Sequence, residues 1–288
     1  MRNGLLTGED ILEFYERGFI RPGRVFDDDE VAELRELVES VTAHEQAEGR
    51  RYDLLDPALW PDEADGSQPE TADDSPARRV DFLFNLWRVD PRIQKFVFDP
   101  RLARWAAQLI GSTAVRLLED NALWKEPASG GELKWHQDYP YWPLAQANAV
   151  TAWIALDDTD ADNGAMSAAV GSHLTGERLP AAFGTGTPYL HEQRPDVVKP
   201  IRDPELEGFA VDTISLGVGE VSFHSPLLWH GSGPNNTDRP RRAVIIRYVG
   251  DGTIWLGSQR YEYNYTDEEV GLTAGDPIGG EYFPLIPA

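Results

Sequence analysis

The segments Trp135-His136-Gln137-Asp138 and Phe223-His224-Ser225-Pro226-Leu227-Leu228-Trp229-His230-Gly231-Ser232-Gly233 contain the pattern that decides the fold. Side chains two apart on a β-strand share a face, so His136 and Asp138 are expected to converge on one point. A neutral imidazole and a carboxylate suit a divalent iron, zinc or manganese ion. A His-x-Asp pair alone is common by chance and also fits an ordinary polar strand edge. A distant histidine from the second segment, which contains His224 and His230, would complete a two-His-one-carboxylate triad, which leaves three coordination positions open.

Arg241 and Arg242 follow the second segment and add a cation to this pattern. An arginine on the strand after His230 can pair bidentately with a carboxylate held near the metal. Because side chains alternate along a strand, one of the two arginines faces inward and the other outward.

The chain around these segments changes character at Gly111. Before it, apolar residues at helical spacing predict helices at Gly8–Arg17, after Asp27–Asp29 and at Pro100–Ile110. After it come short segments of β-rich composition, separated by turns that contain Gly, Pro and Asn: Ala114–Leu118, Ala122–Lys125, Leu133–His136, Val150–Leu156, Val221–His224 and Ala243–Val249. This order predicts an all-β sandwich or barrel and not alternating βαβ units.

We expect one domain over residues 1–288, with a mainly helical support region at 1–111 and a β core at 112–250. The Gly-, Pro- and charge-rich stretch 173–212 is interpreted as a lid-like insertion, and 251–288 as a C-terminal extension. The polar stretch 56–77 is expected to be a surface loop.

Charge and cysteine content exclude several classes of protein. The 288 residues include 26 basic and 49 acidic side chains, a formal charge of −23, so we expect neither nucleic acid nor an anionic membrane as partner. The chain has no cysteine, which removes disulfides, Cys-ligated zinc, iron–sulfur clusters and thiol nucleophiles. Without a visible secretory signal or an apolar run of ~18 residues, we expect a soluble cytoplasmic protein.

Several sequence blocks, in a characteristic order from about Asn121 to Tyr248, resemble the phytanoyl-CoA dioxygenase-like (PhyH) family of Fe(II)/2-oxoglutarate oxygenases. They are Lys125 with Trp135-His136-Gln137-Asp138, Ala155-Leu156-Asp157-Asp158-Thr159, Asn163-Gly164-Ala165-Met166, Gly171-Ser172-His173, and His230-Gly231-Ser232-Gly233 with Arg241 eleven residues after His230. The resemblance implies a mainly β fold, in which a double-stranded β-helix core of jelly-roll or cupin type has the helical N-terminal region packed against it.

The resemblance also implies roles for particular residues. His136, Asp138 and His230 would be the Fe(II) ligands, Arg241 would bind the distal carboxylate of 2-oxoglutarate, and Ser232 would be its hydrogen-bonding neighbour. The spacing from His230 favours Arg241 over Arg242. Further candidates for the cosubstrate pocket are Trp153, Thr151 and Lys125.

The implied reaction consumes O2 and 2-oxoglutarate, releases succinate and CO2, and hydroxylates an unactivated C–H bond of a small molecule. Epimerisation, cyclisation and desaturation use the same triad and stay open, whereas Asp138 disfavours halogenation, because related halogenases lack this carboxylate. Aromatic residues near the ligands can line a mouth for an apolar or polycyclic substrate, and a natural-product intermediate is expected. The candidate substrate residues are Tyr139, Tyr141, Trp142, Trp229 and His224.

Two other kinds of protein compete with this interpretation. A jelly-roll protein that binds a small ligand without catalysis would be expected to lose at least one of the three metal ligands or Arg241. A zinc- or manganese-dependent cupin isomerase would have more histidines and no need of Arg241. The sequence leaves open whether the protein is a monomer or a homodimer.

Overall fold

The computed structural model describes residues 4–48, 52–53, 80–129, 131–178, 201, 203–258 and 265–287. The predicted surface loop at 56–77 and most of the predicted insertion at 173–212 lie outside the described residues. Within the part described, none of the helices combines the length and the apolar character that crossing a bilayer requires.

Three longer helices form where the sequence predicts them. Helix α1 spans Gly8–Arg17 with a capping box from Thr7, α2 spans Asp28–Ala47 with a capping box from Asp27, and α5 spans Pro100–Ile110 between Asp99 and Gly111. In each capping box a side chain accepts a bond from a backbone N–H that the helix leaves unpaired. Shorter helical turns are α3 Leu86–Val89, η3 Pro91–Ile93, α4 Gln94–Val97, η4 Tyr139–Tyr141, η5 Ser172–Thr175 and α7 Asp267–Val270.

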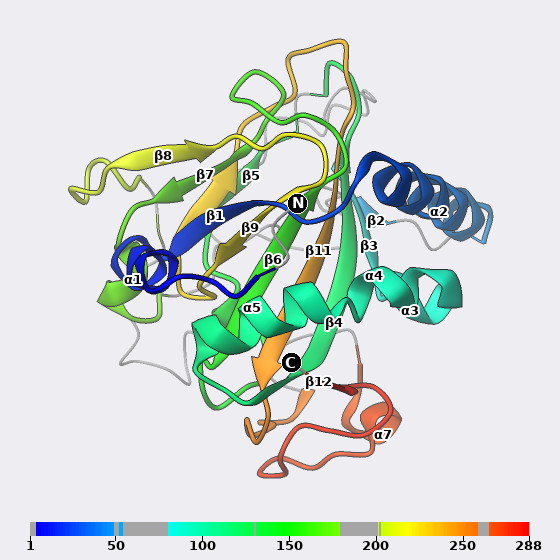
Figure 1. Cartoon of the computed structure of the whole chain (residues 1–288), viewed down its shortest axis with the longest axis vertical. Coiled ribbons are helices and arrows are strands. Elements are labelled where there is room, and N and C mark those ends of the chain that lie inside the picture. Colours follow the sequence, from blue (N-terminus) through cyan, green and yellow to red (C-terminus); the bar gives the residue numbers. More distant parts are fainter. Residues whose placement is uncertain are drawn as a thin grey trace, which may run out of the picture.

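Two antiparallel sheets form the centre of the molecule (Figure 1). The larger has the order β1-β9-β6-β11-β4-β3-β2, with β12 also paired to β4. Its strands are β1 Phe19–Arg24, β2 Tyr52–Asp53, β3 Asp81–Phe84, β4 Ala114–Lys125, β6 Ala149–Ala155, β9 Glu220–His224, β11 Arg241–Gly250 and β12 Leu285–Pro287. The smaller sheet has the order β5-β10-β7-β8, from β5 Leu133–His136, β10 His230–Ser232, β7 Met166–Ala169 and β8 Val211–Ile214.

The two faces of the larger sheet bury different cores. Ala152 and Ile154 of β6 pack with Trp105 of α5 in one hydrophobic cluster, so the helices cover this face. Trp153 and Ala155, the alternate residues, pack with Met166 and Ala168 of the smaller sheet in a second cluster. The second cluster therefore fills the space between the two sheets, as in a double-stranded β-helix, and the prediction of a mainly β fold with a packed helical N-terminal region is confirmed.

One strand corrects the sequence prediction. Ala114–Leu118 and Ala122–Lys125 were expected as two strands, but β4 runs unbroken through both. The residues between them, Glu119, Asp120 and Asn121, are buried although they are polar. A polar run of this kind is typical of a turn, so the pattern predicts a break where the structure has a strand with buried polar partners.

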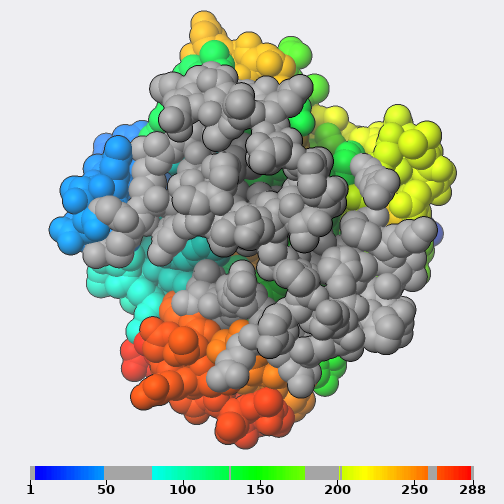
Figure 2. All heavy atoms as spheres, turned by 180° about the vertical axis from the view of Figure 1, so that it is seen from behind, coloured from blue at the N-terminus to red at the C-terminus, as the bar shows by residue number. Residues whose placement is uncertain are grey.

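Seen from behind in Figure 2, the C-terminal segment, coloured orange to red, gathers at one end of the molecule. Its Trp255, Val270 and Phe283 form a third cluster with Trp142 and Val249. This cluster closes the end of the β core near the segment that follows β5.

Candidate metal centre

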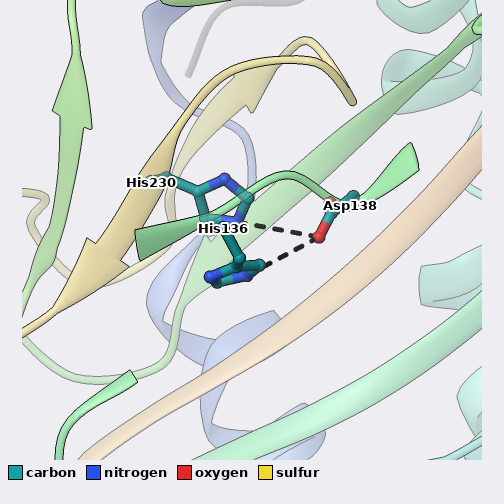
Figure 3. Close-up of side chains that lie close together, drawn as sticks. All are labelled: His136, Asp138 and His230. Atoms are coloured by element: carbon teal, nitrogen blue, oxygen red, sulfur yellow. Dashed lines mark ion pairs between the residues drawn. The ribbon is translucent and has the colours of Figure 1, made fainter. Parts of the chain in front are cut away.

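His136, Asp138 and His230 meet at the ends of two neighbouring strands of the smaller sheet. His136 is the last residue of β5, His230 is the first of β10, and the two pair directly in the sheet register. Asp138 Oδ1 lies 4.0 Å from His136 Nε2 and 3.6 Å from His230 Nε2 (Figure 3). One ligand atom from each residue lies within 4.8 Å of the others. The structure therefore brings the predicted triad together.

The prediction that His136 and Asp138 converge because they lie two residues apart on one strand is wrong in one detail. Asp138 does not continue β5, because its backbone has the α conformation, φ −72° and ψ −42°, at the start of η4. The turn into η4, and not the alternation of a strand, directs the carboxylate toward His136.

Both imidazoles are prepared as metal ligands. His136 Nδ1 lies 2.7 Å from the Lys134 carbonyl oxygen, and His230 Nδ1 lies 2.9 Å from that of Leu228. A carbonyl only accepts, so Nδ1 carries the proton in each ring and Nε2 keeps its lone pair toward Asp138. Burial lowers the pKa of both histidines, which favours the neutral form that a metal requires.

Asp138 is kept ionised although it is buried. Burial alone raises the pKa of a carboxyl group, but the positive charge of Arg247 and the contact with His224 outweigh it. The pKa of Asp138 is consequently well below its ordinary value. A buried carboxylate and two neutral imidazoles are the donor set of a non-haem iron site.

Four polar residues form a single row across the larger sheet beside the triad. The strand registers pair Glu119 of β4 with Arg247 of β11, Arg247 with Thr151 of β6, and Thr151 with His224 of β9. All four side chains are buried. We call them the polar row.

Three members of the polar row contact Asp138. Thr151 Oγ1 donates to Asp138 Oδ2 at 2.8 Å, and His224 Nε2 lies 3.4 Å from the same oxygen. Arg247 Nη2 lies 3.7 Å from Oδ1, and its Nη1 donates to Glu119 Oε1 at 2.8 Å and to Asn121. Thr151 and His224 were predicted as cosubstrate and substrate residues, and the structure places both on the aspartate.

Sequence reasoning missed Arg247, Glu119 and Asn121. Side-chain alternation along β11 could have predicted Arg247, because residues 241, 243, 245 and 247 share the face of the strand that points into the β core. Ala243 and Ile245 lie in the cluster between the sheets, which identifies that face.

Arg241 and Lys125 form a buried pair of basic residues, six residues along β11 from Arg247. They are directly paired in register and both are fully buried. Lys125 Nζ donates to Ser232 Oγ at 2.7 Å and to the Gly233 carbonyl oxygen at 2.5 Å. The Arg241 guanidinium carbon lies 5.6 Å from the centre of the Trp153 ring, and its Nε and Nη1 have no hydrogen-bond partner among the described residues.

Both basic groups have pKa values below their ordinary ones. Burial lowers the pKa of Arg241 to about 9. Burial and the neighbouring charge of Arg241 lower the pKa of Lys125 to about 6. Arg241 has donors that no described residue uses, and such donors fit a carboxylate, which accepts them bidentately; Lys125 adds a second positive charge when it is protonated. The predicted candidates Ser232, Trp153 and Lys125 thus lie close to Arg241 or to its partner Lys125.

The side chain of Arg242 lies on the face of β11 opposite to that of Arg241. It donates to Asp157 at 2.7 Å and also pairs with Glu39 of α2. Its charge is therefore already matched, which leaves Arg241 as the arginine of this pair that can accept an external anion.

The predicted substrate residues lie in two different places. Tyr139, Tyr141 and Trp142 belong to the cluster with the C-terminal segment. Burial and the charge of Asp138 raise the pKa of Tyr141 well above its ordinary value. Trp229 instead packs with Ala169 and Phe209, and Arg178 lies 4.6 Å from the centre of its ring. Trp229 therefore belongs to a different cluster from Tyr139, Tyr141 and Trp142, and its role in substrate binding stays a prediction.

Comparisons with known proteins agree with this site. Among curated proteins, the chain is 31% identical over 151 residues to a probable alpha-ketoglutarate-dependent hypophosphite dioxygenase of Stutzerimonas stutzeri. The matched residues cover 52% of this chain and 50% of that protein. It is 28% identical to an ectoine dioxygenase of Bordetella bronchiseptica, over 83% of this chain and 74% of that protein. The chain thus spans half to three quarters of the length of these two relatives.

Solved structures match the fold over nearly the whole chain. The alpha-ketoglutarate-dependent carbocyclase SnoK from nogalamycin biosynthesis has a TM-score of 0.72 and 24% identity, covering 98% of this chain and 96% of that one. The epimerase SnoN from the same biosynthesis, in complex with Fe3+, alpha-ketoglutarate and nogalamycin RO, has a TM-score of 0.71 and 22% identity, covering 96% and 97%. The phytanoyl-CoA dioxygenase (PhyH) family matches residues 14–243, which include the triad and Arg241. The chain belongs to the phytanoyl-CoA dioxygenase family.

Proposed function

We propose that the protein is an Fe(II)- and 2-oxoglutarate-dependent dioxygenase that hydroxylates a C–H bond of a small molecule. The observation that carries this proposal is the pairing of the His136–Asp138–His230 triad with the buried Arg241, whose guanidinium has donors without partners among the described residues. A cosubstrate with a carboxylate at each end fits between a metal and such a cation. The balanced reaction is R–H + O2 + 2-oxoglutarate → R–OH + succinate + CO2.

Iron held by the triad would supply the activation of O2, with 2-oxoglutarate as the source of two electrons. His136 and His230 offer Nε2 to the metal, while their Nδ1 protons stay on backbone carbonyls. Arg241 and Lys125 hold the distal carboxylate of the cosubstrate. The Trp153 ring excludes water from the pocket between the sheets.

For the substrate, we propose a natural-product intermediate with an apolar or polycyclic body. The support is the group of aromatic side chains Tyr139, Tyr141 and Trp142, which follows the metal ligand Asp138 and packs against the C-terminal segment. Rigid aromatic rings offer a large contact area to such a ligand.

The same site also serves epimerisation, cyclisation or desaturation, and the mass of the product separates these reactions. Hydroxylation adds one oxygen atom, desaturation and cyclisation remove two hydrogen atoms, and epimerisation leaves the mass unchanged. A screen of candidate substrates that reads succinate release and product mass together tests the substrate proposal.

The activity itself is tested first without any substrate. Under anaerobic conditions, the protein with Fe(II) and 2-oxoglutarate is expected to form the weak visible charge-transfer band of a metal-chelated 2-oxo acid. His136→Ala should abolish this band and also succinate formation. His44→Ala is the matched control, because His44 lies on α2 with its side chain 57% exposed. A folded wild-type protein without the band would refute the proposed function, and ligand binding without succinate release would favour a non-catalytic binding protein.

A further inference from the structure

The two oxygens of Asp138 have different surroundings. Oδ1 faces the imidazole Nε2 atoms of His136 and His230 at 4.0 and 3.6 Å. Oδ2 accepts a hydrogen bond from the Thr151 hydroxyl at 2.8 Å, and His224 Nε2, which makes no hydrogen bond to a described residue, lies 3.4 Å from it. The carboxylate is 5% exposed, so solvent does not compete for either oxygen.

This difference matters because a carboxylate can bind a divalent ion through one oxygen or through both. A two-His-one-carboxylate site leaves three positions open only if the carboxylate uses one oxygen. The cosubstrate chelate fills two of these positions and O2 needs the third. A second bond from the aspartate would remove one of them.

We propose that Thr151 and His224 are positioning residues that hold Asp138 Oδ2 and so restrict the carboxylate to a single bond with the metal. The proposal rests on the proposed function, because it concerns the coordination positions that the cosubstrate and O2 require. Both act through Asp138.

The construction of the larger sheet supports this assignment. Thr151 and His224 are register partners on β6 and β9, next to each other in the polar row. The residue after Thr151 on β6, Ala152, points to the helical face, as does Phe223 before His224. Two adjacent central strands thus present a hydroxyl and an imidazole at one point between the sheets, where burying them has a cost unless they meet a polar partner.

Arg247 completes the arrangement from the other side. Its Nη2 is 3.7 Å from Oδ1, and Glu119 and Asn121 fix the guanidinium through Nη1. The cation keeps Asp138 ionised, whereas Thr151 and His224 decide which oxygen faces the metal.

The first test counts the water molecules on a bound metal and needs no cosubstrate. The protein is loaded with Mn(II), and the number of coordinated waters is measured by water-proton relaxation. Wild-type protein is expected to hold three waters, one for each open position. Thr151→Val, which keeps the shape of the side chain but cannot donate, is expected to hold two, and Thr151→Ser should restore three.

The second test compares two affinities in the same variants. Thr151→Val should weaken 2-oxoglutarate chelation to the Fe(II) protein about tenfold or more, while the affinity for Fe(II) does not fall. His224→Gln should also weaken 2-oxoglutarate chelation, and this variant is used as the test if Thr151→Val does not fold. Thr42→Val is the matched control, because Thr42 is buried on α2 and donates only to the Val38 carbonyl oxygen.

Three results would overturn the inference. Unchanged water number and unchanged 2-oxoglutarate affinity in both variants would mean that Oδ2 does not need to be held. Equal losses of metal and 2-oxoglutarate affinity would indicate a role in the fold or in metal binding as such. Loss of metal from His224→Gln alone would make His224 a ligand. A wild-type protein that binds Mn(II) but never chelates 2-oxoglutarate would refute the proposed function, and the water count would still test the role of Thr151.

Discussion

Binding of 2-oxoglutarate should be coupled to the uptake of a proton by Lys125. Burial and the charge of Arg241 lower the pKa of Lys125 to about 6. At pH 7.5 only about 3% of this side chain is then protonated. The carboxylate of the cosubstrate supplies the missing negative charge, and the pKa of Lys125 in the complex should return toward the ordinary value of about 10.4.

The size of the effect follows from these two pKa values. At pH 7.5, close to one proton should be taken up for each 2-oxoglutarate bound. Between pH 6 and the pKa in the complex, the affinity should fall by about tenfold for each pH unit, or about 1.4 kcal/mol of binding free energy. Below pH 6 Lys125 is already protonated, so this part of the pH dependence should disappear.

Isothermal titration calorimetry measures the uptake directly. The metal-loaded protein is titrated with 2-oxoglutarate anaerobically in phosphate and in Tris, whose ionisation enthalpies differ, and the difference in heat gives the number of protons. Lys125→Met should bind more weakly at pH 6 and without proton uptake at pH 7.5. Lys95→Met, at an exposed lysine on α4, should behave like wild type. Uptake near zero in the wild type, or unchanged uptake in Lys125→Met, would refute the reasoning.

Three further predictions concern the arginine pair, the buried Asp120 and the metal. Arg241→Gln should raise the Kd for 2-oxoglutarate about a hundredfold with little effect on stability. Arg242→Gln loses its bonds to Asp157 and Glu39, so it should leave that Kd unchanged and lower the free energy of unfolding by about 1–3 kcal/mol in urea titrations. The reverse result would assign the cosubstrate to Arg242. Burial raises the pKa of Asp120 from 3.8 to about 8, so the folded state keeps a proton that the unfolded state loses, and stability should fall as pH rises from about 4 to 8. The difference between the two pKa values corresponds to at most about 6 kcal/mol, and Asp120→Asn should flatten this pH dependence in denaturant titrations; an equally steep profile in the variant would contradict it. Mn(II) at a hundredfold excess over its Kd should stabilise the protein by about 2.7 kcal/mol in thermal unfolding, with EDTA reversing the effect; His136→Ala should show no such gain and His44→Ala the full gain.

The sequence was sufficient for the features that depend on local order. Thr7 and Asp27 begin the first two helices because each is followed three residues later by an acidic side chain that completes a capping box. The His-x-Asp pair and the second histidine segment predicted a metal site, and the family resemblance selected His230 as the third ligand. Alternation along β11 predicted that Arg241 and Arg242 face opposite ways.

The same rules failed where buried polar residues imitate a turn. Glu119 and Asn121 contributed to the expected break in β4, yet both bond to Arg247 within the β core. Their partner is 126 to 128 residues away in the sequence, so no local pattern indicates that these side chains are satisfied. Asp138 similarly reaches His136 through a turn that strand periodicity does not describe.

The sequence by itself therefore determined which chemical groups are available: two imidazoles, one carboxylate and an excess of arginines after the last histidine. Only the tertiary structure decided which partner each of those groups contacts. It placed Glu119, Arg247, Thr151 and His224 in one row, three of whose members contact Asp138. It also left donors of Arg241 without a partner among the described residues and paired Arg242 with Asp157. The physical reason is that spacing along a strand fixes the face of a side chain, whereas its partners depend on the register between strands, and that register is set by the packing of the whole sheet.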